Sequence, residues 1–196
     1  MPLLNITEVC EGVRLGLWRM EEEPEELLSG FPHLRRLECP YKHSARRKEF
    51  FSVRALLMAM TGDPSLRIDH TESGRPVVKG WQLSISHTKG YAALMLSRAK
   101  AVGVDIEYRS DRVVKIASHY IRPDEKAETV EQMLVLWCAK ETLYKLHSDD
   151  NLDYFEMRAI TPQEGSKLML ENMKRGQQVK VHVVSAPDYV LTWAVA

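Results

Sequence analysis

Two acidic side chains stand at a spacing that suits metal chemistry. Asp105 and Glu107 alternate with Val104 and Ile106 in a predicted strand over residues 101–107. Both carboxylates therefore point to one face of the strand, about 6–7 Å apart. Two carboxylates this close repel one another unless they are solvated, share a proton or bind a cation. A solvated strand face is the commoner reason for such a pair, because charged residues are mostly exposed.

A third acid follows on a predicted helix over residues 129–147. Glu141 and Lys145 lie one turn apart in this helix and can be presented together. Oxygen ligands without His or Cys suit Mg²⁺, with Mn²⁺ as the alternative ion, rather than Zn²⁺. The plainer interpretation of Glu141 and Lys145 is a surface ion pair that stabilises the helix by about 0.3–0.5 kcal/mol.

Groups that can hold a phosphate stand earlier in the chain. Ser86 and His87 end a predicted strand and offer a hydroxyl and an imidazole beside the amides of a turn. Upstream, Gly74-Arg75-Pro76 places a cation on a stiff turn. Turns attract polar residues in any case, so each group taken alone is more simply a local hydrogen-bonding residue.

Two helices and five strands are needed to position these groups. Apolar periodicity predicts helices over residues 44–60 and 129–147 and strands over residues 82–87, 90–96, 101–107, 178–184 and 189–195. The order helix, connection, strand, strand thus occurs twice. We therefore predict an α+β fold of two similar α/β halves, residues 1–98 and 99–196, related by a pseudo-two-fold axis, each an antiparallel sheet packed with helices. Two unrelated lobes of one domain are the alternative.

The composition limits the partners and the location. The chain of 196 residues has 27 basic and 27 acidic side chains, which disfavours a protein that coats nucleic acid. Residues 33–54 nevertheless hold seven cations and two acids, so a small polyanion can be bound locally. No apolar stretch approaches the ~20 residues of a membrane span, and residues 1–8 lack a secretory pattern. The widely spaced Cys10, Cys39 and Cys138 suit reduced thiols, so we predict a cytoplasmic protein.

The chain resembles the 4′-phosphopantetheinyl transferases in the order of four motifs. These are Gly74-Arg75-Pro76, Ser84-Ile85-Ser86-His87-Thr88, Val102-Gly103-Val104-Asp105-Ile106-Glu107 and Trp137-Cys138-Ala139-Lys140-Glu141-Thr142-Leu143-Tyr144-Lys145. The last two are the most specific, and the resemblance extends from about Arg46 to Lys145. It is greatest to the Sfp-type branch, whose members are monomeric pseudo-dimers of about this length.

The resemblance implies an enzyme that transfers the phosphopantetheine arm of coenzyme A to a serine of an apo acyl or peptidyl carrier protein, releasing 3′,5′-ADP. This is holo-acyl-carrier-protein synthase activity in fatty acid, polyketide or nonribosomal peptide synthesis. It implies magnesium ligands at Asp105, Glu107 and Glu141, and catalytic roles for Glu141 and Lys145. The resemblance also implies residues that bind coenzyme A. In the first half these are Arg36, Arg47, Lys48, Gly74, Arg75, Pro76, Ser86 and His87, and in the second half Lys145. Of the basic residues, Arg36, Arg47 and Lys48 are looser matches, as is Arg46, to cations near the 3′-phosphate.

A base must take the proton from the carrier serine, and Glu141 is the candidate, directly or through a water. Residues 108–130 are a plausible docking region for an acidic carrier protein, with an ordinary surface segment as the alternative. Residues 146–151 lack the glycines common in the family, which leaves the preferred carrier open.

Two other functions suit parts of this pattern. A two-metal nuclease also uses Asp-x-Glu with a later helical Glu, but Ser86-His87 and the absence of a broad basic surface disfavour it. A catalytically silent module that binds coenzyme A or a carrier protein would not need all three acids.

Overall fold

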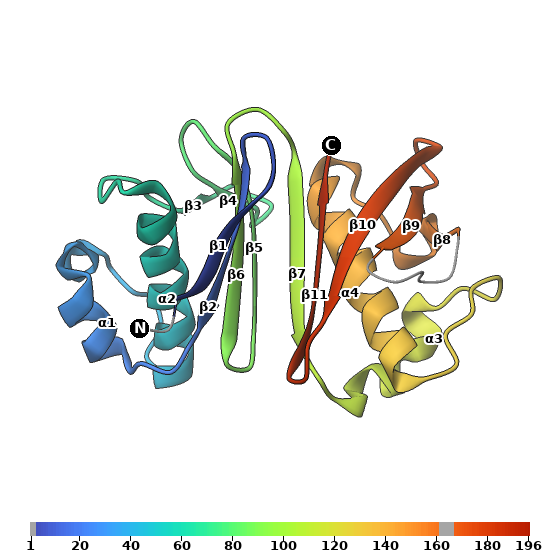
Figure 1. The fold of residues 1–196 in the computed structure, drawn as a ribbon, viewed down its shortest axis with the longest axis horizontal. Coiled ribbons are helices and arrows are strands. Elements are labelled where there is room, and N and C mark those ends of the chain that lie inside the picture. Colours follow the sequence, from blue (N-terminus) through green and yellow to red (C-terminus); the bar gives the residue numbers. More distant parts are fainter. Residues whose placement is uncertain (1–2, 161–166) are drawn as a thin grey trace. The chain divides into compact units, whose positions relative to one another are not determined.

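The structure is a computed structural model that describes residues 3–160 and 167–196, so the first two residues of the N-terminal stretch discussed above lie outside it. Contacts divide the chain into two compact units, Met1–Ala99 and Lys100–Ala196. Each unit combines helices with an antiparallel sheet (Figure 1). The mixed, antiparallel character of the predicted fold is confirmed, whereas the pseudo-two-fold relation remains a prediction.

The first unit is built on a four-stranded sheet in the order β1-β2-β6-β5. Its strands are β1 (Leu3–Cys10), β2 (Val13–Arg19), β5 (Gln82–Thr88) and β6 (Tyr91–Ser97). The long helix α2 (Ser44–Thr61) packs against β2 and β6 (Figure 1). Phe51, Leu56 and Met60 of this helix are buried with Leu94 and Leu96 of β6 in the first core. The helix ends at Gly62, whose left-handed backbone (φ 70°) suits glycine.

Smaller elements surround that sheet. They are α1 (Pro24–Gly30), the 3₁₀-helix η1 (Pro32–Arg36) and a hairpin of β3 (Asp69–His70) with β4 (Pro76–Val77). The acidic run of residues 21–26 starts α1, where Glu23 occupies the N-cap and forms a capping box with Glu26. The run is therefore a helix start.

The second unit is built on a five-stranded sheet in the order β7-β11-β10-β9-β8. Its strands are β7 (Val102–Tyr108), β8 (Met157–Ala159), β9 (Lys167–Asn172), β10 (Gln177–Ser185) and β11 (Tyr189–Val195). The helix α4 (Val130–Leu146) packs on β7 and β11. It begins with a capping box between Thr129 and Gln132. Short helical segments complete the unit: η2 (Asp111–Ile116), α3 (Ala117–Tyr120), η3 (Ser148–Asp150) and η4 (Tyr154–Glu156).

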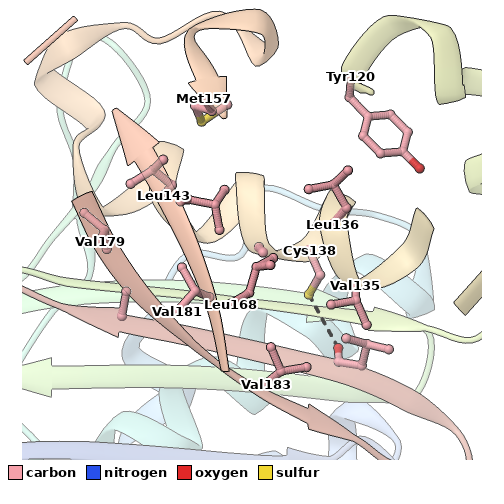
Figure 2. Close-up of a cluster of buried hydrophobic side chains, with 14 of the residues drawn as sticks. Tyr120, Val135, Leu136, Cys138, Leu143, Met157, Leu168, Val179, Val181 and Val183 are labelled. Atoms are coloured by element: carbon pink, nitrogen blue, oxygen red, sulfur yellow. Dashed lines mark hydrogen bonds between the residues drawn. The ribbon is translucent and has the colours of Figure 1, made fainter. Parts of the chain in front are cut away.

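The core of the second unit lies between α4 and the sheet (Figure 2). Leu136 and Leu143 of the helix are buried in one cluster with Val181 and Val183 of β10. Polar groups also join helix and sheet, because the Cys138 thiol donates to the Val190 carbonyl (3.6 Å). Next to this bond the hydroxyls of Thr142 and Thr192 lie 2.6 Å apart.

All seven elements predicted from periodicity are present, with ends within one residue of those expected. The turn expected at Thr88-Lys89 lies one residue later, where Gly90 supplies a left-handed backbone (φ 82°). Strands β1, β2, β3, β4, β8 and β9 were not predicted. Within the described residues, helices of the length and apolarity needed for a membrane crossing are absent.

Candidate functional site

A buried charge pair joins β7 to α4. Asp105 is only 3% exposed and faces the helix. The Lys145 ammonium donates to Asp105 Oδ1 at 2.6 Å, and Glu141 lies one turn earlier on the same helix. This arrangement follows from the sequence, because Asp105 shares a strand face with Gly103, whose missing side chain lets α4 approach.

The pKa shifts show that these groups influence one another. Burial raises the pKa of Glu141, and the negative charge of Asp105 raises it further, against the opposing effects of the Tyr154 hydroxyl and Lys145. Burial alone would lower the pKa of Lys145, but the charges of Asp105 and Glu141 raise it above the ordinary lysine value. Two interacting carboxylates with only oxygen donors have the chemistry of a site for a hard cation such as Mg²⁺.

Glu107 is the neighbouring acid along the same interface. It accepts a hydrogen bond from Trp137 Nε1 at 3.1 Å, and Trp137 precedes Glu141 by one helical turn. Each of the three acids thus contacts a different protein donor: Lys145, Trp137 or Tyr154. In the part of the chain that the structure describes, three or more His, Cys, Asp or Glu side chains are not gathered in metal-binding geometry. The donor chemistry fits a magnesium ion, and the ligand assignment remains a prediction.

Two residues of this region were given no role by the sequence. The Tyr154 hydroxyl donates to Glu141 Oε1, although Tyr154 lies outside every motif. Lys140 belongs to the helix motif, and its side chain is fully buried in an ion pair with Glu125 (2.8 Å). No periodicity places Tyr154 or Glu125 beside the helix, so only the folded chain reveals them.

The first unit holds a separate cavity of about 470 Å³ between α2, β5 and the β3 segment. His87 lines it together with Arg46 and Glu49 of α2. Glu49 lies 2.8 Å from Arg46 Nη1 and 3.7 Å from His87 Nδ1, and Arg54 and Arg67 line the cavity as well. The cavity therefore offers cations to an anionic ligand, with one carboxylate among them.

Arg54 is a half-buried cation of this cavity. Its guanidinium lies 3.4 Å from the centre of the Phe50 ring and donates to the Phe50 carbonyl (3.0 Å). Burial lowers its pKa to about 10, so it remains charged at neutral pH. In the sequence Arg54 is one of the seven basic residues of the segment 33–54, and no pattern assigns it a role.

The remaining basic candidates lie elsewhere in the first unit. Arg47 and Lys48 are paired with acids of the α1 region, Glu25 (3.1 Å) and Glu23 (2.7 Å). Exposed Arg36 lines a second hollow of about 390 Å³. Of the three consecutive cations on α2, the first one, Arg46, lines the cavity with His87.

The last candidates of the first unit lie on the β3–β4 hairpin and on β5. Gly74 adopts a left-handed backbone (φ 82°) in the hairpin turn, and the Arg75 amide donates to Thr71 Oγ1. Pro76 begins β4 opposite His70. Ser86 and His87 are neighbours on β5 and so point to opposite faces of the sheet, with His87 on the side of α2. The structure therefore does not bring these two side chains together within the unit.

The comparison with known families concerns the second unit. Residues 101–194 match the family model of the 4′-phosphopantetheinyl transferase superfamily. The matched segment contains Asp105, Glu107, Glu141 and Lys145. No curated protein matches the chain. This match supports the predicted superfamily over that segment, and the Sfp-type branch remains a prediction. The similarity to the 4′-phosphopantetheinyl transferase superfamily thus covers residues 101–194, almost the whole of the second unit.

Proposed function

We propose that this chain is a magnesium-dependent, monomeric 4′-phosphopantetheinyl transferase of the Sfp type. It would move phosphopantetheine from coenzyme A to a serine of an apo acyl or peptidyl carrier protein and release 3′,5′-ADP. The observation that carries the proposal is the Asp105–Lys145 pair beside Glu141, inside the segment that matches the superfamily. A membrane or nucleic acid plays no part in this reaction.

The first unit supplies coenzyme A-binding residues in this proposal. Coenzyme A carries a pyrophosphate and a 3′-phosphate, which guanidinium and imidazolium groups bind well. Arg46, Arg54 and His87 line one cavity and so support this role most directly. The other candidate cations, Arg36, Arg47 and Lys48, lie outside that cavity. Coenzyme A would have to compete with Glu25 for Arg47 and with Glu23 for Lys48, whereas Arg36 is exposed at the surface.

The second unit supplies the acids and the reacting helix. Asp105, Glu107 and Glu141 would hold the magnesium ion. When bound, the ion would neutralise charge that builds on the pyrophosphate as the P–O bond breaks. The donor set fits this role, because the negative charge of Asp105 raises the pKa of Glu141, and a bound cation would offset that repulsion.

Glu141 and Lys145 then perform the chain's own part of the reaction. The serine oxygen bonds to the pyrophosphate phosphorus next to the pantetheine arm, and the bond from that phosphorus to the bridging oxygen breaks. The electron pair leaves with 3′,5′-ADP, and the serine proton passes to Glu141. A raised pKa brings the Glu141 carboxylate closer to the range of an effective base at neutral pH. The Lys145 ammonium, fixed by Asp105, provides a positive charge for the phosphate oxygens.

The test is to incubate the chain with coenzyme A, Mg²⁺ and an apo carrier protein, and to measure the mass of the intact carrier. Carriers of fatty acid, polyketide and nonribosomal peptide synthesis are each tried, and each has a control with the acceptor serine changed to alanine. We expect a gain of one phosphopantetheine, lost on chelation of Mg²⁺ and absent with the control carrier. Binding of coenzyme A without a mass gain on any carrier would instead support a silent binding module, and cleavage of added nucleic acid would support a nuclease.

A further inference from the structure

Two stacked aromatic rings contact two of the predicted metal ligands. Tyr154 of η4 and Trp137 of α4 stack with ring centroids 5.1 Å apart and an interplanar angle of 30°. The Tyr154 hydroxyl donates to Glu141 Oε1 (2.5 Å), and Trp137 Nε1 donates to Glu107 Oε1 (3.1 Å). Each ring therefore directs one hydrogen bond at one acid, and the stacking couples the positions of the two donors.

The backbone of Tyr154 is held by a buried lysine. Lys140 Nζ donates to the Tyr154 carbonyl (3.2 Å), the Tyr120 carbonyl (2.6 Å) and Glu125 Oε2 (2.8 Å). These three bonds use all three protons of the ammonium. The side chains of Lys140 and Glu125 are 0% and 1% exposed, so water does not compete for the bonds. The carbonyl of Tyr154 is consequently fixed relative to α4.

Glu125 extends this framework to the edge of the sheet. Its Oε1 accepts the amide of Ala159 in β8 (2.6 Å), and its Oε2 also accepts the amide of Arg122 (2.9 Å). The segment before α4 and the strand after η4 are thus joined at one carboxylate. Tyr154 lies in η4, directly before β8, and is therefore close in the chain to this attachment.

Three neighbouring residues of α4 hold Tyr154 at three different points. Trp137 contacts its ring, Lys140 its carbonyl and Glu141 its hydroxyl. A side chain fixed in this way keeps one rotamer, so its hydroxyl direction is set by packing before any substrate arrives. Because Glu141 Oε1 accepts this hydroxyl, the carboxylate plane of Glu141 is set as well.

We propose that Tyr154 is a positioning residue for Glu141: its hydroxyl occupies Oε1 and orients the carboxylate so that Oε2 is available for the proton of the acceptor serine. The inference rests on the proposed function. Tyr154 acts through Glu141 and does not itself touch the reacting atoms.

The test is Tyr154→Phe, which keeps the ring and its stacking and removes only the hydroxyl. We expect kcat for phosphopantetheine transfer to fall by about tenfold to a hundredfold, because small errors in the orientation of a base are costly. The KM for coenzyme A should stay within about twofold, since Tyr154 binds no part of it. An unchanged kcat would overturn the proposal.

Tyr120→Phe is the matched control. Tyr120 also packs on Trp137, edge to face with centroids 5.1 Å apart, but its hydroxyl donates to the Met133 carbonyl (3.0 Å) and not to an acid. Its loss should lower the melting temperature and leave kcat within about twofold. An equal loss of kcat in both variants would mean that the Tyr154 hydroxyl contributes only to packing, and it would overturn the proposal.

A second readout does not depend on activity. Glutamate side chains are labelled with ¹³C at the carboxyl, and the Glu141 resonance is assigned by its absence in Glu141→Gln. We expect this resonance to shift in Tyr154→Phe and not in Tyr120→Phe, at one pH and without added metal. If the wild type transfers no phosphopantetheine while the shift is seen, the proposed function fails and the positioning contact stands. If the resonance is the same in all proteins that contain Glu141, the positioning contact is overturned whatever the activity.

Discussion

Both units pack one long helix across an antiparallel sheet, yet they differ in what lies between helix and sheet. Beneath α2 the buried side chains are mainly apolar, with Leu56 and Met60 of the helix facing the strands. Between α4 and its sheet, Asp105 and Thr142 are buried, and Lys140 of the same helix is buried against Tyr120, Glu125 and Tyr154. Burying charges is costly unless they are paired and hydrogen-bonded. The second unit thus carries a cost that stability alone does not require, as expected where acids must react.

The two helices also approach their sheets differently. A side chain on Gly16 of β2 would lie 2.6 Å from Met60 Sδ and 2.8 Å from Leu56 Cδ1, which are ends of flexible side chains. On Gly103 of β7 it would lie 2.4 Å from the Thr142 carbonyl oxygen of α4. The first interface is closed by side chains that can move and the second by helix backbone. A rigid approach of this kind keeps Glu141 and Lys145 in register with Asp105.

Glu141→Gln is the largest expected loss, because it removes the proposed base and one predicted metal ligand together. Transfer to the carrier protein should fall below detection by mass, a loss of at least about a thousandfold, while the far-UV circular dichroism stays native. Glu131→Gln is the control on the same helix, since Glu131 pairs with Arg109 and Ser185 away from the site. If Glu141→Gln turned over at a rate close to that of Glu131→Gln, Glu141 would have no part in the reaction. The two units would then not differ in function in the way proposed.

Lys140→Met tests the buried charge pair of the second unit. It leaves the Glu125 carboxylate buried without its cation, and we expect a loss of about 3–5 kcal/mol in the free energy of unfolding. Lys48→Met is the counterpart in the first unit, where the partner Glu23 is 60% exposed, and the urea midpoint should hardly move. Similar midpoints for both variants would contradict the view that only the second pair is costly to break.

The spacing of residues within the motifs predicted much of the arrangement of the candidate site in the second unit. Asp105 and Glu107 follow strand alternation, and Glu141 and Lys145 follow the helical turn, so local geometry alone groups them. Tyr154 could not be predicted, because a 3₁₀-segment brings it back to the helix and leaves no periodic trace.

In the first unit the sequence could not choose among neighbouring cations. Arg46, Arg47 and Lys48 are consecutive on α2, and each helical residue points about 100° from the last. Only the fold shows that Arg46 lines the cavity while Arg47 and Lys48 turn to acids near α1. Strand β1 was missed for a related reason: it is a mostly exposed edge strand and so lacks a clear apolar alternation.

Gly103→Ala and Gly16→Ala compare the two helix–sheet contacts directly. At Gly103 the new methyl group meets helix backbone, so α4 must shift, and we expect a loss of about 3 kcal/mol. At Gly16 the side chains of Leu56 and Met60 can rotate away, and about 1 kcal/mol is expected. Chemical denaturation of both variants measures the difference. Because Gly103→Ala displaces the helix that carries Glu141, the kcat of this variant should fall as well. If Gly16→Ala destabilised the protein as much as Gly103→Ala or more, the contact at Gly103 would not be the more rigid one.

The smallest expected difference concerns the starts of the two helices. Thr129 caps α4, its side chain accepts the Gln132 amide, and the Gln132 side chain accepts the Thr129 amide in return. Thr129→Ala should therefore cost about 1 kcal/mol of stability. His43 stands at the start of α2 without a side-chain cap bond, so His43→Ala should change the free energy of unfolding by less than about 0.5 kcal/mol. Thermal unfolding resolves the two. If Thr129→Ala were as silent as His43→Ala, α4 would be held at its first turn by packing alone. The position of Glu141 would then depend on the contacts of Lys140 and on the close approach of α4 to Gly103 of β7.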